Sequence, residues 1–157
     1  WLGGSAVAVR RIRKYPDEAL RSICQPVKRV NGRVRALLRD MADTMYHASN
    51  GCGLAACQIG VPLRLVVIDV DDELIKLVNP QIVESSGEQI AIEGCLSFPD
   101  LWGKVRRPAW VKVRALNGWG RPIEIEGEDL MAVCLCHEID HLDGVVFTDK
   151  VLEYVED

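Results

Sequence analysis

Residues 130–142, LMAVCLCHEIDHL, limit the possible folds of this chain more than any other segment. They have the pattern of a helix, with Asp129 as a candidate N-cap and Gly144 just past the expected end. Apolar side chains cover much of the expected helix surface: Val133, Leu135, Ile139 and Leu142. A helix that is apolar over most of its circumference is buried, so other parts of the chain must cover it.

The segments before this helix follow helical and then strand patterns. Residues 17–25 predict a short helix that Pro26 ends, and residues 33–49 predict an amphipathic helix that stops at Asn50 and Gly51. β-branched and alternating runs predict strands over 63–70 and 74–80, two strands within 81–94 that turn at Ser86-Gly87, and a hairpin over 109–127 that turns at Asn117-Gly118.

Helices first, then strands and one late helix indicate an α+β fold with a mostly antiparallel sheet packed on helices. The 157 residues fit a single domain, which we expect to span 1–157. Residues 1–5, WLGGS, have the composition of a linker, and we interpret them as wholly or partly foreign to the domain.

Charge and cysteine usage exclude several classes of protein. A net charge of −4 gives no support to a broad nucleic-acid-binding face, and no apolar run is long enough to cross a membrane. The N-terminus does not have the pattern of a signal peptide, because its arginines follow the short apolar stretch. Six cysteines without a CxxC pair indicate reduced thiols in a cytosol, and we expect Cys24, Cys52 and Cys57 to be buried packing residues.

His137 and His141 lie four residues apart, which places both imidazoles on one face of the predicted helix. Two imidazoles in that arrangement can bind one metal ion. Glu138 projects beside that face, as a general base acting on metal-activated water would. The alternative is a surface helix with two exposed histidines, and the apolar neighbours argue against it.

A third ligand must come from another segment. The remaining histidine, His47, falls at a helix end and is more typical of a surface or capping residue. Cys95 is the better candidate, because it follows a glycine at the end of a predicted strand. Cys134 shares the histidine helix and is expected to line a pocket, whereas Cys136 points away from the histidine face.

The stretch GCGLAACQ, residues 51–58, contains small residues that let an extended ligand pair with the backbone. It lacks the spacing of a dinucleotide-binding or phosphate-binding loop. Gln58 at its end can donate its amide to a developing oxyanion. Glycine-rich turns are common, so this stretch is weak evidence of a site by itself.

Three segments, GCGLAACQ (51–58), EGCLS (93–97) and CHEIDH (136–141), resemble in order and spacing the signature motifs of peptide deformylases, GxGLAAxQ, EGCLS and QHExDH. The resemblance runs from about Val9 to Asp149, and includes YPDEALR near the start and GVVFTD after the last motif. It implies mostly antiparallel sheets packed around a central metal-binding HExxH helix. It also implies hydrolysis of the formyl group of N-terminal formyl-methionine in new bacterial or organellar proteins, with release of formate.

The resemblance implies roles for the residues that match these motifs. Cys95, His137 and His141 match the metal ligands, and Glu138 matches the catalytic glutamate. A thiolate and two neutral imidazoles would leave a divalent ion with one net positive charge and an open tetrahedral position. Glu93 matches a motif residue that we expect to support the ligands without reacting itself.

Further matches concern the substrate. Gln58 and the backbone N–H of Leu96 match the groups that stabilise the oxyanion, and Gly53 and Gly94 match positions whose backbone binds the formyl-peptide. A pocket for the methionine side chain is expected to include Val133 and Cys134.

The resemblance also implies one divalent metal ion, Fe²⁺ in the cell. Cys/His₂ chemistry suits Zn²⁺ well, and Zn²⁺, Ni²⁺ or Co²⁺ can occupy such a site in a purified sample. The implied partners are formyl-methionyl nascent peptides and the ribosome near its exit tunnel. The implied location is the bacterial cytoplasm, with an organelle as the alternative.

One residue departs from the family pattern, since Cys136 stands where the motif has glutamine. This puts a hydrogen bond near the ligands in doubt, because a thiol is a weak donor. Two other functions stay open: a zincin-type metallopeptidase, and a catalytically silent homologue that only binds metal or formyl-peptide. A zincin needs HExxH but not EGCLS, and intact Glu138, Gln58 and Cys95 argue against a silent homologue.

Overall fold

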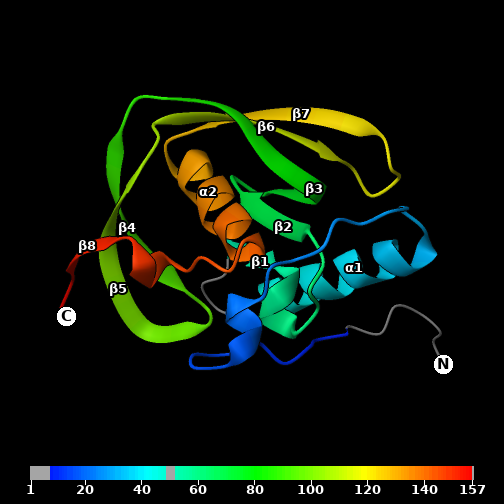
Figure 1. The fold of residues 1–157 in the computed structure, drawn as a ribbon, viewed down its shortest axis with the longest axis horizontal. Coiled ribbons are helices and arrows are strands. Elements are labelled where there is room, and N and C mark those ends of the chain that lie inside the picture. The colour runs from blue at the N-terminus through cyan, green and yellow to red at the C-terminus, as the bar shows by residue number, and fades with distance from the viewer. Residues whose placement is uncertain (1–7, 49–51, 157) are drawn as a thin grey trace.

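Two antiparallel sheets form the framework of the protein in a computed structural model that describes residues 8–48 and 52–156. The larger sheet has the order β1-β2-β3-β6-β7 (Figure 1). Its strands are β1 (Gly53–Ala55), β2 (Leu65–Val70), β3 (Glu73–Ser86), β6 (Trp110–Leu116) and β7 (Pro122–Glu128). The smaller sheet has the order β4-β5-β8, with β4 (Gln89–Cys95), β5 (Phe98–Arg107) and β8 (Val151–Tyr154).

Helices α1 (Gly32–His47) and α2 (Leu130–Leu142) pack on opposite faces of the larger sheet (Figure 1). Strand β2 shows why: Val66 and Ile68 point into the apolar cluster around α2, while Leu65 and Val67 point into the cluster around α1. All four side chains are buried, as expected of a strand covered on both faces. The run of apolar residues in 63–70 is therefore continuous because a helix covers each face of the strand.

Helix α2 lies under the larger sheet, with the smaller sheet beside it (Figure 1). Its bounds agree with the prediction. Asp129 occupies the N-cap position as predicted, but within the described chain its side chain accepts no hydrogen bond from the first turn. The backbone N–H of Asp129 donates to Ala109 and its carbonyl accepts from Gln89, which holds φ at 54° instead of the extended conformation that an N-cap uses.

Several strand boundaries differ from the predictions. The two strands expected on either side of Pro80 are one strand, β3, whose register shifts between Val78 and Gln81 to accommodate Asn79 at a φ of 53°. β1, β5 and β8 were not predicted, since β1 has three residues and β5 contains Pro99 and an Asp100 with positive φ.

The short helix predicted from Asp17 is one 3-10 turn, η1 (Glu18–Arg21), and two further such turns are η2 (Ala56–Ile59) and η3 (Phe147–Asp149). The predicted linker at 1–5 and the predicted helix stop at Asn50 and Gly51 lie outside the described residues. Among the residues described, no helix is long and apolar enough to cross a bilayer. The prediction of an α+β fold with antiparallel sheets is confirmed.

Candidate metal centre and substrate cavity

The buried face of α2 presents both histidines of the HExxH motif to one place. His137 is 7% exposed and His141 is completely buried. Their ring centroids lie 5.1 Å apart, one turn of the helix from each other. The alternative of two exposed histidines on a surface helix is therefore wrong.

Cys95 reaches this place from the last residue of β4. Its Sγ lies 3.4 Å from His141 Nε2, and one donor atom from each of Cys95, His137 and His141 lies within 4.8 Å of the others. One soft thiol and two imidazoles at this spacing are a donor set that fits a divalent ion such as zinc or iron. The other histidine, His47, is exposed at the end of α1 and lies outside this cluster.

A buried charged network orients His137. Its Nδ1 lies 2.8 Å from Glu93 Oε1, and Arg107 binds the Glu93 carboxylate through two hydrogen bonds of 2.7 and 2.9 Å. Arg107 also donates to Asp140 at 2.7 Å. Burial alone would raise the pKa of Glu93, but the hydrogen bonds from Arg107 and His137 outweigh it and lower that pKa. A carboxylate at Nδ1 fixes that nitrogen as a donor and leaves Nε2 free to bind a metal ion.

Glu138 lies beside the three donors, and a glycine makes room for it. A Cβ built on Gly53 would lie 2.7 Å from Glu138 Oε2, so a side chain at position 53 would displace the carboxylate. Burial raises the pKa of Glu138 to about 7, and its Oε1 has no hydrogen-bond partner among the described residues. A buried carboxyl group with a free oxygen is able to exchange a proton with a ligand in the cavity.

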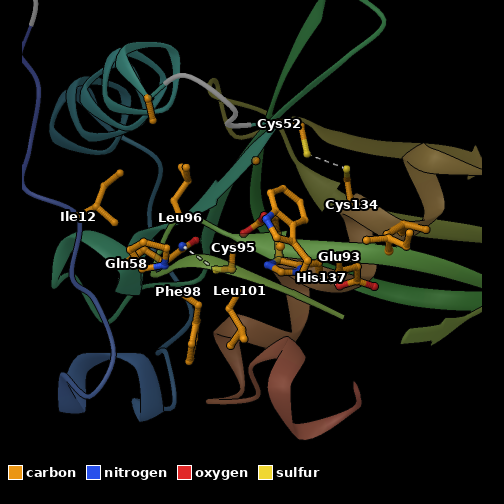
Figure 2. Close-up of a pocket in the computed structure, with 18 of the residues that line it drawn as sticks. Ile12, Cys52, Gln58, Glu93, Cys95, Leu96, Phe98, Leu101, Cys134 and His137 are labelled. Atoms are coloured by element: carbon orange, nitrogen blue, oxygen red, sulfur yellow. Dashed lines mark hydrogen bonds and ion pairs between the residues drawn. The ribbon is translucent and has the colours of Figure 1, made fainter. Parts of the chain in front are cut away.

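Gln58 approaches the cluster from η2 with a fixed amide orientation. The backbone N–H of Ala55 donates to Gln58 Oε1 at 2.9 Å, which directs Nε2 toward Ser97 Oγ at 3.1 Å. Nε2 also lies 3.5 Å from Cys95 Sγ (Figure 2). Leu96 lies in the turn between Cys95 and Phe98, the residues that pair β4 with β5. Gln58 and Leu96 therefore flank Cys95 from two different segments.

A cavity of about 510 Å³ opens over these residues. Every predicted site residue lines it except His141, which lies beneath: Gly53, Gln58, Gly94, Cys95, Leu96, Val133, Cys134, His137 and Glu138. Cys52 is exposed and also lines the cavity, so the prediction that it is a buried packing residue is wrong. It immediately precedes β1, which is the edge strand of its sheet, whereas Cys24 and Cys57 are buried as predicted.

Comparison with known proteins identifies the family. The model of the polypeptide deformylase family matches residues 9–156. A peptide deformylase of Acetivibrio thermocellus is 57% identical over 151 residues, which cover 96% of this chain and 88% of that protein. The chain belongs to the peptide deformylase family. Peptide deformylase 2 of Clostridium acetobutylicum is 49% identical over 150 residues, which cover 96% of this chain and 100% of that protein.

Solved structures of peptide deformylases have the same fold. The crystal structure from Legionella pneumophila has a TM-score of 0.88 and 50% identity, and covers 92% of this chain and 86% of that one. The structure from Thermotoga maritima has a TM-score of 0.88 and 37% identity, and covers 91% and 97%. Peptide deformylases use a divalent metal ion, in keeping with the donor set found here.

The sequence did not reveal three features of this deformylase site. Arg107 is 3% exposed, yet it lies in a stretch of positive charges, VRRP, that is more typical of a surface. Ser97 is fully buried and binds Gln58. The N-terminal segment also contacts the site: Arg13 N–H donates to the Gln58 carbonyl and Tyr15 N–H to the Ser97 carbonyl. One signal could have pointed to Arg107: a buried Glu93 needs a partner for its charge.

Proposed function

We propose that this chain is a metal-dependent hydrolase that removes the formyl group from the N-terminal formyl-methionine of newly made polypeptides and releases formate. Membership of the peptide deformylase family supports the reaction itself, since members are hydrolases that remove N-terminal formyl groups. The observation that carries the residue assignment is the convergence of Cys95, His137 and His141 in one buried cluster with Glu138 beside it.

In this proposal Cys95, His137 and His141 hold a divalent ion. When bound, the ion supplies Lewis-acid chemistry, which lowers the pKa of water and polarises a carbonyl oxygen. The chain prepares the ligands for it, because Glu93 accepts a hydrogen bond from His137 Nδ1 and so leaves Nε2 free to bind the ion. The helix that carries both histidines then serves as the central metal-binding HExxH helix of the fold.

Glu138 is the proposed proton carrier. Its carboxylate takes a proton from the water that attacks the formyl carbon, and later gives that proton to the leaving amine. Three observations support this assignment: Glu138 lines the cavity, its buried Oε1 has no hydrogen-bond partner among the described residues, and its Oε2 fits closely against Gly53. Formate and a free N-terminal amine are the products.

The oxyanion of the tetrahedral intermediate is proposed to receive hydrogen bonds from Gln58 Nε2 and the backbone N–H of Leu96. The hydrogen bond from Ala55 to Gln58 Oε1 supports this, because it turns the amide nitrogen toward the thiol of Cys95 before substrate arrives. A donor that is already oriented loses little entropy when it binds the oxyanion.

The cavity is proposed to hold the formyl-methionyl end of the substrate. β1 is the edge strand of its sheet, so an extended peptide can add to it beside Gly53. Val133 and Cys134 on α2 would contact the methionine side chain. Gly94 has a different structural reason to be glycine, since a Cβ there would lie 2.5 Å from the Trp102 ring that walls the cavity.

Further assignments belong to the same proposal. We expect Fe²⁺ in the cell, one catalytic domain over 1–157, and action on nascent chains near the ribosomal exit tunnel. Bacterial relatives support the cytoplasm of a bacterium over an organelle. The zincin alternative loses support because the third donor is Cys95 of EGCLS. A catalytically silent homologue is not favoured by any observation in the structure.

The test is formate release from formyl-Met-Ala by Fe²⁺- or Ni²⁺-loaded protein. We expect Glu138→Ala to lower the rate of formate release at least about 10²-fold, because a general acid–base is lost, while metal content stays unchanged. Cys95→Ser should lower metal content, and His47→Ala, at the exposed histidine, should leave rate and metal unchanged. No formate from a folded, metal-loaded sample would reject the function, and full metal content in Cys95→Ser would reject that ligand.

A further inference from the structure

Two thiols that are not among the proposed metal ligands meet on the wall of the cavity. Cys52 Sγ and Cys134 Sγ lie 3.1 Å apart and point toward one another (Figure 2). They come from separate elements: Cys52 precedes β1, and Cys134 belongs to α2. A disulfide bond is about 2.05 Å long, so a shift of roughly 1 Å would join them.

The chain contains a second thiol pair that serves as an internal comparison. Cys24 and Cys57 belong to the same buried apolar cluster, and they are only 2% and 1% exposed. Cys52 is exposed at the cavity, where a small oxidant can reach it. Because access and thiolate content govern thiol oxidation, the two pairs should differ in reactivity.

The surroundings also give the two cavity thiols different pKa values. The hydrogen bond from the Cys134 thiol lowers the pKa of Cys52 to about 7, and the same hydrogen bond with burial raises the pKa of Cys134. A thiol with a pKa near the ambient pH combines thiolate content with nucleophilicity. Cys52 is therefore the attacking residue of the pair and Cys134 the resolving one.

We propose that Cys52 and Cys134 are an oxidative modification site, at which hydrogen peroxide forms a reversible disulfide on the cavity wall. The Cys52 thiolate attacks one peroxide oxygen, which breaks the O–O bond and gives a sulfenic acid and, after protonation, water. Cys134 sulfur then attacks the sulfenic sulfur, its proton leaves with the hydroxyl group as a second water, and the S–S bond forms. The two thiols lose two electrons and the peroxide gains them. A dithiol reverses the change by thiol–disulfide exchange.

The disulfide would connect the start of β1 to α2 one turn before Glu138. Gly53, next to Cys52, already fits closely against the Glu138 carboxylate, so the link stiffens a contact without moving the metal ligands. This expectation rests on the proposed function: oxidation should raise KM for formyl-Met-Ala several-fold and change kcat less. The cavity wall changes shape while Cys95, His137 and His141 keep their places.

The experiment uses the Zn²⁺-loaded protein, because zinc does not itself react with peroxide. The protein is treated with graded hydrogen peroxide, quenched with an alkylating agent, digested and mapped by mass spectrometry. We expect a peptide linking Cys52 to Cys134, lighter than the two free peptides by two hydrogen atoms, at doses that leave Cys24 and Cys57 alkylated. Dithiothreitol should remove it. Cys52→Ser should abolish it, and Cys136→Ala should retain it, because Cys136 is buried and does not line the cavity.

Several outcomes would overturn the proposal: a Cys24–Cys57 link at the same or lower doses, sulfinic acid at Cys52 with Cys134 still a thiol, or no link at doses that oxidise glutathione. Cys52 is exposed, so its serine variant keeps the test valid even if a variant at buried Cys134 fails to fold. Disulfide mapping needs no turnover, so a failure of the deformylase assignment is separately visible. A link that left KM unchanged would reject only the effect on the substrate.

Discussion

The two sides of the candidate metal centre are held in different ways. On the charged side, Glu93 and Arg107 form a buried ion pair that positions His137 on one edge of the cluster. On the amide side, Gln58 is positioned by neutral hydrogen bonds to Ala55 N–H and Ser97 Oγ. One side depends on charges with almost no access to water, and the other on uncharged groups.

Because of this difference, substitutions on the charged side should mainly lower stability, and substitutions on the amide side should mainly lower catalysis. A buried charge that loses its partner is strongly destabilising, so damage to the charged side should unfold the protein before it reveals a chemical role. A neutral hydrogen bond contributes about 0.5–1.5 kcal/mol, so the amide side can be altered in a folded protein. The predictions below test that separation.

The largest effect is expected from Arg107→Met. Methionine has a similar length and no charge, so the buried Glu93 carboxylate loses its cationic partner and keeps only the hydrogen bond with His137 Nδ1. We expect the free energy of unfolding to fall by about 3–5 kcal/mol in urea denaturation. Adding Glu93→Gln should recover part of this loss, because the unpaired charge is removed.

Arg114→Met is the matched control. Arg114 also pairs with a glutamate, Glu124, at 3.1 Å, but its side chain is 69% exposed. Exposed pairs contribute at most about 1 kcal/mol, so this variant should unfold almost like the parent. Equal losses in the two arginine variants would mean that burial does not distinguish the Glu93–Arg107 pair, and the charged side would lose its proposed structural role.

A change on the amide side should lower kcat without unfolding the protein. Gln58→Leu keeps the size of the side chain but removes the Nε2 donor, and losing one oxyanion donor costs about 10²–10³-fold in kcat. Metal content should stay at the parent level, since Gln58 is not a proposed ligand. The measurement is formate release alongside metal analysis.

Gln81→Leu, at an exposed position of β3, is the control for the chemical change and should leave kcat unaltered. A Gln58→Leu protein that kept its kcat would remove Gln58 from the oxyanion site. One that lost its metal would place Gln58 among the groups that hold the ion.

Local patterns predicted the helices of this fold well. The bounds of α2 agree with the apolar pattern of 130–142, and Val66 and Ile68 belong to a continuous apolar run because a helix covers each face of β2. β3 was split at Asn79-Pro80, because proline ordinarily ends a strand and only tertiary pairing shows that this one continues through a bulge. β8 has four residues and exists through its pairing with β5, which no local signal encodes.

The candidate site was predictable where its chemistry has a fixed spacing. The four-residue interval of His137 and His141 determines their shared face, and a resemblance of motifs pointed to Cys95. Arg107 and Ser97 were missed because their roles depend on what the fold places next to them. Cys52 was misjudged for the same reason: its exposure follows from the edge position of β1, which a sequence of small residues does not reveal.

The smallest effect is expected at Ser97, on the amide side of the centre. Ser97→Ala removes the hydroxyl that accepts from Gln58 Nε2 but leaves the Ala55 hydrogen bond that orients the amide. The Ser97 carbonyl still accepts from Tyr15 N–H, so the backbone should not move. We expect a loss of about 1 kcal/mol in the free energy of unfolding and a several-fold fall in kcat, with metal content unchanged.

Measuring formate release and urea denaturation on the same Ser97→Ala preparation distinguishes the roles of this residue. A fall in kcat near that of Gln58→Leu would show that Ser97 itself contacts the reacting carbonyl. An unchanged kcat would show that the Ala55 N–H alone orients Gln58. The intermediate result expected here would mean that two neutral contacts hold the amide side in parallel, and that each can partly replace the other. On the charged side, by contrast, the buried Glu93 carboxylate is paired with the Arg107 guanidinium, and no neutral contact can replace that charge.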